Sequence, residues 1–273
     1  MKEEALALIK DVSAPADKIN LLREYIQAMV LRSLHESEAF VNLCFVGGTA
    51  LRFIHNLPRF SEDLDFSVEP NSRYKPELWM KKVKSDLQFA GFDVSVSWHD
   101  RTTVHKAWVK VAGILKDAGL AAVPEQKLSI KLEIDSNPPK GYVSKTGIIN
   151  RHTMFALRYY DLSSLMAGKI HALITRKYAK GRDWYDLIWY RGKRPPVEPN
   201  LNFLQNALDQ TQGKDVYCSE NWRDHVAERL SVLESAVLVN DVQNFLEHPA
   251  DAGLLTKENI NFLLMQPLGA SIS

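Results

Sequence analysis

The chain has 273 residues, of which 45% are hydrophobic and 25% charged, a composition typical of folded globular proteins that excludes disordered, collagen-like and coiled-coil classes. Its length allows one large or two smaller domains. Lys and Arg (34) nearly balance Asp and Glu (33), so binding to nucleic acid must come from a local basic patch and not from the overall charge.

Cysteine usage and hydropathy indicate a reducing compartment. Cys44 lies in the apolar run VNLCFVGG and Cys218 is far from it in sequence, a pattern that predicts free thiols and no disulfide framework. No stretch approaches the roughly 18 apolar residues of a transmembrane helix, and the N-terminus lacks the basic-then-apolar order of a secretory signal. We therefore expect a cytoplasmic protein that does not enter a membrane.

The first part of the chain reads as helix, strand, glycine turn and helix. Apolar residues at helical spacing predict a helix over residues 17–39, with Asp17 as its N-cap. A short apolar strand over 41–46 then leads through Gly47 and Gly48 into a second helix.

Alternating polar and apolar residues predict a largely antiparallel sheet in the next part. The strands are expected at 63–68, 92–98, 104–111 and 126–135, with a helix over about 75–90 and β-like pieces up to Tyr160. Asp161 is the predicted N-cap of the first of several helices, the last of them over 240–248. The pattern predicts an α+β fold with one domain at 1–155, which includes N-terminal helices, and a mainly helical domain at 156–273.

A glycine turn followed by paired aspartates is the first feature with chemical meaning. Gly47, Gly48 and Thr49 open a helix whose backbone N–H groups can approach phosphate oxygens. Asp63 and Asp65 are two apart on a strand, so they share a face and can ligate Mg²⁺, and two metals there would activate a hydroxyl and stabilise leaving pyrophosphate. Each half alone is more often a plain turn or an exposed strand; together they favour nucleotide and metal binding.

The strand IKLEID offers a third carboxylate. Its period of two places Glu133 and Asp135 on the polar face, opposite the apolar side chains. We favour Glu133, because apolar residues flank it while Asp135 lies at the strand end. The alternative is a solvated charged face without a function.

Residues 165–195 form a local basic stretch with eight Lys or Arg and only two Asp, a local charge of +6. Interleaved aromatic residues suit base stacking, although Trp184, Leu187 and Ile188 at helical spacing fit a core better. Asp183 and Asp186 share a helix face beside these cations, as ion-pair partners or as a catalytic base. The cations expected to hold an RNA backbone are Arg176, Lys177, Lys180 and Arg182.

From about residue 40 to about 195 the chain resembles the AbiEii/AbiGii group of nucleotidyltransferase toxins, which includes the MenT-type enzymes. The resemblance rests on GGTALRFIHNLPRFSEDLDFSV, KLEID and GKIHALITRKYAKGRDWYDLIWY, in this order. It implies a polymerase-β-type nucleotidyltransferase fold with an added helical domain, and Mg²⁺-dependent transfer of a nucleoside monophosphate from an NTP. In characterised branches the acceptor is the 3′ end of tRNA, and such toxins are commonly paired with an AbiEi-type antitoxin, a winged-helix DNA-binding protein.

The resemblance also implies roles for single residues. The expected nucleotide-binding residues are Gly47, Gly48, Thr49, Lys169 and Arg182; the expected catalytic residues are Asp63, Asp65, Lys169 and Asp186; the expected metal ligands are Asp63, Asp65 and Glu133. Lys169 would bind triphosphate oxygens, and Asp186, or else Asp183, would accept the proton of the acceptor hydroxyl. Two alternatives are a small-molecule or protein nucleotidyltransferase and a non-catalytic RNA-binding regulator.

Overall fold

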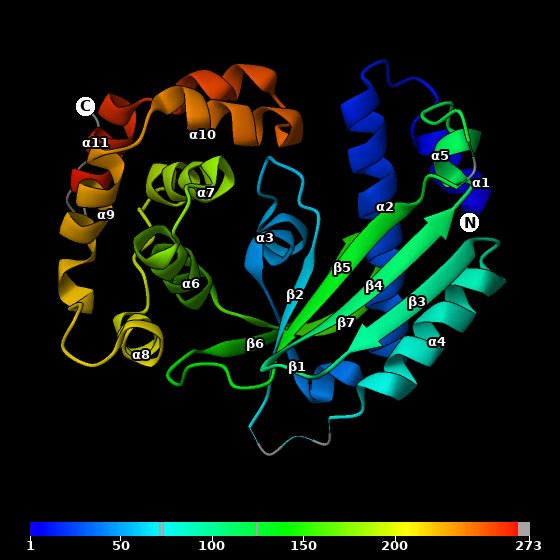
Figure 1. Ribbon diagram of the computed structural model, residues 1–273, viewed down its shortest axis with the longest axis horizontal. Coiled ribbons are helices and arrows are strands. Elements are labelled where there is room, and N and C mark those ends of the chain that lie inside the picture. Colours follow the sequence, from blue (N-terminus) through cyan, green and yellow to red (C-terminus); the bar gives the residue numbers. More distant parts are fainter. Residues whose placement is uncertain (71, 73, 124, 267–273) are drawn as a thin grey trace. The chain divides into compact units, whose positions relative to one another are not determined.

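A computed structural model describes residues 1–70, 72, 74–123 and 125–266 (Figure 1). The chain forms two compact units. The first contains Met1–Asn56, Phe60–Pro138 and Ser144–Tyr159, and the second contains Leu57–Arg59, Pro139–Val143 and the chain from Tyr160 onward. Two short segments from the first part of the sequence therefore belong to the second, mainly helical unit.

A mixed sheet with the strand order β3-β4-β5-β2-β1-β7-β6 forms the centre of the first unit. Its strands are β1 Leu43–Val46, β2 Leu64–Val68, β3 Asp93–His99, β4 Val104–Ala112, β5 Leu128–Asp135, β6 Ser144–Arg151 and β7 Thr153–Tyr160. The pairs β3–β4, β4–β5 and β1–β2 are antiparallel, as expected, whereas β2–β5 and β1–β7 are parallel. The parallel pairing places β2 beside β5, which carry the acidic motifs.

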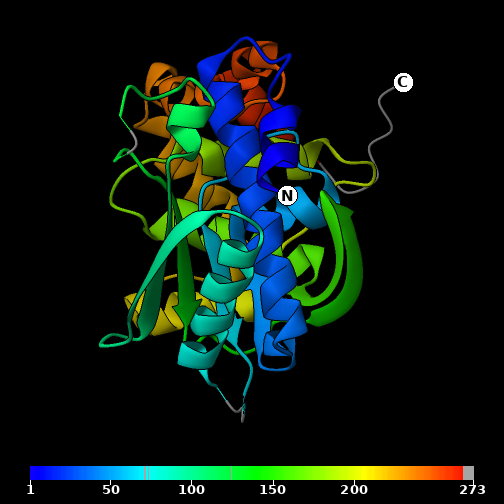
Figure 2. The same ribbon diagram turned by 90° about the vertical axis from the view of Figure 1, so that its right-hand side faces the viewer.

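The helices of this unit are α1 Lys2–Leu8, α2 Pro15–Glu36, α3 Gly47–His55, α4 Pro76–Phe89 and the short α5 Ile114–Asp117, with a 3-10 turn η1 at Ala39–Val41. Of these, α2, α3 and α4 pack against strands of the sheet, and α1 packs against α2. Figure 2 shows α2 and α4 side by side, and α4 packs against β3. Ile130, Leu132 and Ile134 of β5 are fully buried, so the polar side chains of that strand lie on the opposite face, as the alternation predicts.

Asp17 is not the N-cap of α2, and that prediction is wrong. The helix begins at Pro15 with Ala14 as N-cap, and no described side chain makes a cap hydrogen bond there. Proline suits this first position because it lacks the N–H that would have no partner. Asp17 lies in the first turn, where its charge still complements the helix dipole.

The second unit is built around two helices, α6 Leu162–Thr175 and α7 Gly181–Gly192. Around them pack α8 Leu201–Gln212, α9 Trp222–Ser231, α10 Ser235–Val242 and α11 Lys257–Met265. Asp161 caps α6 by accepting a hydrogen bond from the Ser164 N–H at 2.8 Å, as predicted. Trp184, Leu187 and Ile188 are buried, which confirms them as core residues.

The helix predicted over 240–248 is only partly present. It ends at Val242, and a 3-10 turn, η3 Gln243–Phe245, follows. Leu246 adopts an extended conformation, is buried and forms an isolated antiparallel bridge with Arg59, so the backbone cannot continue as a helix. Elsewhere in the described chain, both cysteines have free thiols and Cys44 is buried, as predicted. None of the described helices has the length and apolar character needed to cross a membrane.

Candidate active site

The glycine turn lies directly against one of the paired aspartates. Helix α3 begins at Gly47, immediately after β1, and Val46 of β1 is the register partner of Asp65 on β2. Gly47 has φ +78°, and a Cβ atom there would lie 2.2 Å from Oδ2 of Asp65. Only glycine satisfies both the backbone conformation and this close approach. The helix N-terminus and the carboxylate of Asp65 are therefore adjacent, as the sequence predicts.

Thr49 makes a contact that the sequence did not reveal. Its side chain is fully buried, and its hydroxyl donates a hydrogen bond to the backbone carbonyl of Asp63. The hydroxyl therefore connects the first turn of α3 to the segment that carries the other candidate metal ligand.

The register between β2 and β5 distinguishes the two candidates for the third carboxylate. Asp65 is the partner of Glu133, whereas Asp135 lies two residues farther along, opposite Ser67. Burial raises the pKa of Asp135, against the opposing effect of the Asn137 backbone N–H. Position in the sheet favours Glu133 as the carboxylate that accompanies Asp65.

Lys131 is a cation at this acidic site that the sequence analysis did not single out as a site residue. Its ammonium lies 2.5 Å from Oε1 of Glu133. Burial by itself would lower the pKa of Lys131, but the hydrogen bond and charge of Glu133, with the charges of Asp63 and Asp65, raise it. Lys106 of β4 is 3.9 Å from the same Glu133 oxygen. The carboxylates are thus partly neutralised by lysines on neighbouring positions.

The carboxylates of Asp63 and Asp65 are oxygen donors of the kind that Mg²⁺ uses. Among the described residues, no group of three or more His, Cys, Asp or Glu side chains is arranged to hold a metal ion. Mg²⁺ often uses only one or two carboxylates, keeps several waters and takes up phosphate oxygens. Asp63 and Asp65 supply hard oxygen donors of this kind, while Glu133 is held by Lys131.

A second charged cluster lies inside the helical unit. Asp186 is fully buried and both its oxygens accept hydrogen bonds from Arg59 at 2.6 Å, while Lys169 is 2.8 Å from Oδ2. Asp183 is paired with Lys169 at 2.9 Å and with Arg176 at 2.6 Å. Burial would raise the pKa of Asp183, but Lys169 and Arg176 lower it. The two aspartates, three residues apart on α7, therefore both have the ion-pair role that the sequence left as one of two alternatives.

Arg59 is the member of this cluster that carries part of the family resemblance but to which the sequence assigned no role. It belongs to the Arg59-x-Ser61-x-Asp63-x-Asp65 motif, yet it is buried in the second unit and paired with a residue 127 positions away. A buried arginine needs such a partner. Its position between Pro58 and Phe60 gives no local signal of which carboxylate it contacts.

A family comparison decides what these motifs belong to. The family model described as "Nucleotidyl transferase AbiEii toxin, Type IV TA system" matches residues 30–253, most of the chain. The chain belongs to the AbiEii toxin family. It is therefore a nucleotidyltransferase toxin of a type IV toxin–antitoxin system, and membership implies an antitoxin partner.

Solved structures show the same fold as this AbiEii chain. MenT4, a nucleotidyltransferase toxin from Mycobacterium tuberculosis H37Rv, has a TM-score of 0.60 at 18% identity, over 98% of this chain and 90% of that chain. JHP933 from Helicobacter pylori has a TM-score of 0.50 at 19% identity, over 90% of this chain and 91% of that chain. No curated protein matches the chain. The predicted nucleotidyltransferase fold is confirmed.

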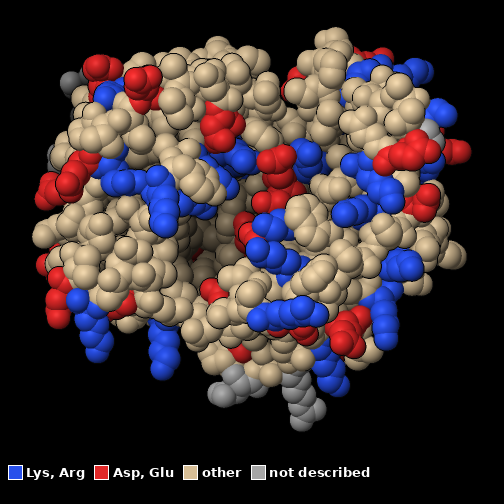
Figure 3. All heavy atoms as spheres, viewed as in Figure 1, with Lys and Arg blue, Asp and Glu red and all other residues tan. Residues whose placement is uncertain are grey.

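The basic stretch of the AbiEii chain is partly occupied by internal contacts. Arg182 is 3.7 Å from Asp241 and its guanidinium lies 4.3 Å from the centroid of the Phe245 ring. Lys177, in contrast, is exposed, as is the neighbouring ring of Tyr178. Figure 3 shows Lys and Arg side chains gathered on the face of the second unit that contains α6 and α7. Of the four cations expected to hold RNA, Lys177 is exposed, while Arg176 and Arg182 are paired with Asp183 and Asp241.

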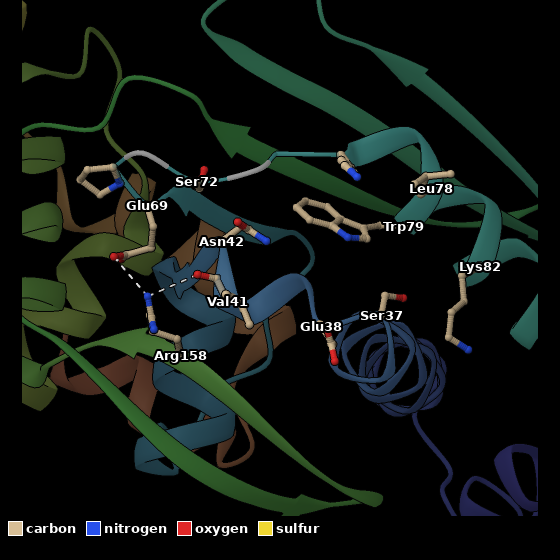
Figure 4. A pocket seen from close by; sticks show the side chains of 12 residues that line it. Ser37, Glu38, Val41, Asn42, Glu69, Ser72, Leu78, Trp79, Lys82 and Arg158 are labelled. Carbon is tan, nitrogen blue, oxygen red and sulfur yellow. Dashed lines mark hydrogen bonds and ion pairs between the residues drawn. The ribbon is translucent and has the colours of Figure 1, made fainter.

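A cavity of about 710 Å³ lies in the first unit of the AbiEii chain, at the opposite end of β1 and β2 from Gly47 and Asp65 (Figure 4). Two of its charged side chains pair with each other, Arg158 and Glu69 at 3.3 Å, and Lys82 is paired with Glu36 and Asp86, which do not line the cavity. None of the candidate site residues lines it.

Proposed function

We propose that this toxin transfers a nucleoside monophosphate from an NTP to the 3′ end of an RNA, a tRNA in the first instance, with Mg²⁺ bound at Asp63 and Asp65. The observation that supports it most is the approach of the α3 N-terminus to Asp65, since a nucleotide's triphosphate and its metal need these two features side by side. The family supplies the reaction type. We also propose that the reaction takes place in the cytoplasm and that the antitoxin partner is of the AbiEi type.

The first unit would bind the triphosphate and the metal. Backbone N–H groups at Gly47 and Gly48 point from a helix N-terminus and suit phosphate oxygens. Asp63 and Asp65 would ligate the metal, with Glu133 beside Asp65 as a third carboxylate. When bound, Mg²⁺ neutralises the charge that develops on the leaving pyrophosphate and lowers the pKa of a bound hydroxyl. The ammonium of Lys131 would balance part of the negative charge of the carboxylates while no metal is bound.

The second unit would contribute Lys169. Its ammonium lies between Asp183 and Asp186, which restrict its position and keep it charged. In the proposed reaction Lys169 binds triphosphate oxygens as a point charge. The base role that the resemblance implies for Asp186 requires this carboxylate to give up at least one of its contacts with Arg59 and Lys169. Arg182, already paired with Asp241, would contribute to nucleotide binding only through its remaining donors.

The test is incubation of the toxin with each radiolabelled NTP and with separate pools of tRNA, protein and small molecules. We expect label in tRNA and its loss with Asp65→Asn or Asp63→Asn, because either change removes one of two paired metal ligands. Label in a small molecule or a protein alone would contradict the RNA proposal and support the alternative acceptors. Absence of transfer from any NTP would support a non-catalytic RNA-binding role.

Salt dependence tests the RNA acceptor separately. Contacts to phosphates release counterions, so tRNA labelling at subsaturating tRNA should fall steeply between about 50 and 200 mM salt. Lys177→Gln/Lys180→Gln should flatten the slope of log affinity against log salt by about 1.4, the value for two single-strand phosphate contacts. Lys81→Gln/Lys84→Gln is a matched control, since both lysines are exposed on α4 of the other unit. Equal slopes in the two double variants would refute the assignment of the basic stretch.

A further inference from the structure

The segment that carries Asp63 lies just before β2 and is contacted by side chains of two helices. Residues 61–63 have no regular secondary structure, and β2 begins at Leu64. Asp65 has register partners on both sides, Val46 on β1 and Glu133 on β5. Asp63 lies one residue before the strand, so the position of its backbone depends on other contacts.

Two buried polar side chains supply three such contacts. The amide nitrogen of Gln27 on α2 donates to the carbonyl oxygens of Ser61, at 3.0 Å, and Glu62, at 2.9 Å. The hydroxyl of Thr49 on α3 donates to the next carbonyl, that of Asp63. Gln27 is 1% exposed and Thr49 is fully buried. Three consecutive carbonyls before β2 are therefore each bound by a side chain from a helix of the same unit.

The chemistry of these donors is specific. A primary amide carries two N–H hydrogens on one nitrogen, so Gln27 can satisfy two carbonyls at once, which a hydroxyl or an apolar side chain of similar size cannot do. The three residues are half-buried, so a carbonyl that loses its donor must bind water or change its geometry, because leaving it without a hydrogen bond is unfavourable. Removing either donor should therefore move or loosen the segment that aims Asp63.

We infer that Gln27 and Thr49 are positioning residues for the metal site: they fix the backbone of residues 61–63 and thereby hold Asp63 beside Asp65 for metal binding. This inference rests on the proposed function, in which Asp63 and Asp65 bind Mg²⁺. Thr49 also lies in the first turn of α3, the proposed phosphate-binding helix. Its hydroxyl links the phosphate turn to the metal-binding segment.

The experiment compares metal binding in variants that keep side-chain shape but differ in hydrogen-bond donors. Gln27→Met and Thr49→Val remove the donors, while Thr49→Ser keeps the hydroxyl and is the matched control. Binding of Mn²⁺ to the full chain is measured by electron paramagnetic resonance of the free ion, without substrate. Hydrogen exchange of the peptide covering residues 57–68 and the melting temperature are measured on the same samples.

We expect Gln27→Met and Thr49→Val to weaken Mn²⁺ binding by at least tenfold, the usual effect of losing an outer partner of a metal ligand. Exchange in residues 57–68 should become faster while the rest of the first unit is unchanged, and Thr49→Ser should bind Mn²⁺ within about threefold of wild type. If Gln27→Met does not fold, the two Thr49 variants decide the question alone.

The outcomes distinguish a failure of the positioning role from a failure of the proposed metal site. If the wild type binds Mn²⁺ and Asp63→Asn loses it, but Gln27→Met and Thr49→Val bind as well as wild type, the positioning role is refuted. Equal loss in Thr49→Ser and Thr49→Val, or faster exchange throughout the unit, would also refute it. If the wild type binds no Mn²⁺, or Asp63→Asn and Asp65→Asn bind it normally, the proposed metal site is wrong and the inference fails with it.

Discussion

Replacing Asp186 with asparagine tests what the buried carboxylate of α7 does. Asp186 has no exposed surface and Arg59 is 1% exposed, so the charge of Arg59 is balanced inside the protein and not by water. Both oxygens of Asp186 bind Arg59 at 2.6 Å, and Lys169 lies 2.8 Å from one of them. Asparagine keeps the shape and one acceptor oxygen but removes the negative charge.

The expected cost follows from these contacts. Breaking a buried ion pair by removing one partner costs about 3–5 kcal/mol, because the remaining charge stays buried without compensation. The retained acceptor oxygen puts Asp186→Asn near the lower end, at about 3 kcal/mol. With an unfolding entropy of about 2.1 cal/mol/K per residue, cooperative unfolding of the chain would give a fall in melting temperature of about 5 °C.

The assay is thermal and urea unfolding, followed by circular dichroism, together with nucleotidyl transfer at a temperature where both proteins are folded. Asp183→Asn is the matched control: it lies on the same helix and also contacts Lys169, but its other partner, Arg176, has a side chain that is 36% exposed and can be hydrated. We expect a smaller loss there than in Asp186→Asn, because water can compensate the charge of Arg176 and Asp186 still neutralises Lys169. The double variant Arg59→Met/Asp186→Asn should recover part of the stability, since it removes the uncompensated guanidinium.

Two results would refute this reasoning. Asp186→Asn unfolding within about 0.5 kcal/mol of wild type would show that the buried pair does not stabilise the unit. If activity were then lost by more than about a hundredfold, the size expected for removal of a general base, Asp186 would be the base and not an ion-pair partner. Loss of stability with most of the activity retained in the folded fraction supports the ion-pair role.

Three further predictions concern the first unit. Gly47→Ala should abolish transfer, because the added Cβ would displace the carboxylate of Asp65. Gly113→Ala is the control: Gly113 has a similar φ of +74° but no atom within 4 Å, so the change should cost only about 1 kcal/mol of stability. Equal activity of the two variants would contradict this prediction. Burial would raise the pKa of Glu24, but the hydrogen bond of a histidine and the charges of two arginines lower it from 4.5 to about 2. Glu24 therefore stabilises the folded protein by up to about 3 kcal/mol above pH 4.5, and this stabilisation is lost as the pH falls toward 2. The stability difference between wild type and Glu24→Gln should therefore shrink over this range in acid unfolding, and a constant difference would show that Glu24 keeps its ordinary pKa. Lys131→Gln removes a cation next to the carboxylates and should tighten Mn²⁺ binding several-fold; unchanged binding, measured by calorimetry, would mean that this lysine does not compete with the metal.

The local structure of this chain follows from its sequence because local patterns carry the physical cause. Polar and apolar residues alternate along β4 and β5, and because neighbouring side chains of a strand point to opposite faces, this alternation predicts which side of each strand lies in the core. Asp161 caps α6 through a hydrogen bond three residues away. Gly47 is required at the β1–α3 turn by its positive φ. The motifs around these elements also sufficed to identify the family and to name Asp63 and Asp65 as candidates.

Tertiary structure alone decided which distant groups meet. The parallel pairing of β2 with β5 puts Glu133, and not Asp135, beside Asp65, because register depends on both strands and not on either sequence. Arg59 contacts Asp186 across 127 residues, and Gln27 reaches the carbonyls before Asp63 from a helix more than 30 residues earlier. A buried charge or carbonyl must have a partner, but nothing in its neighbouring residues specifies which one, so only the folded chain shows it.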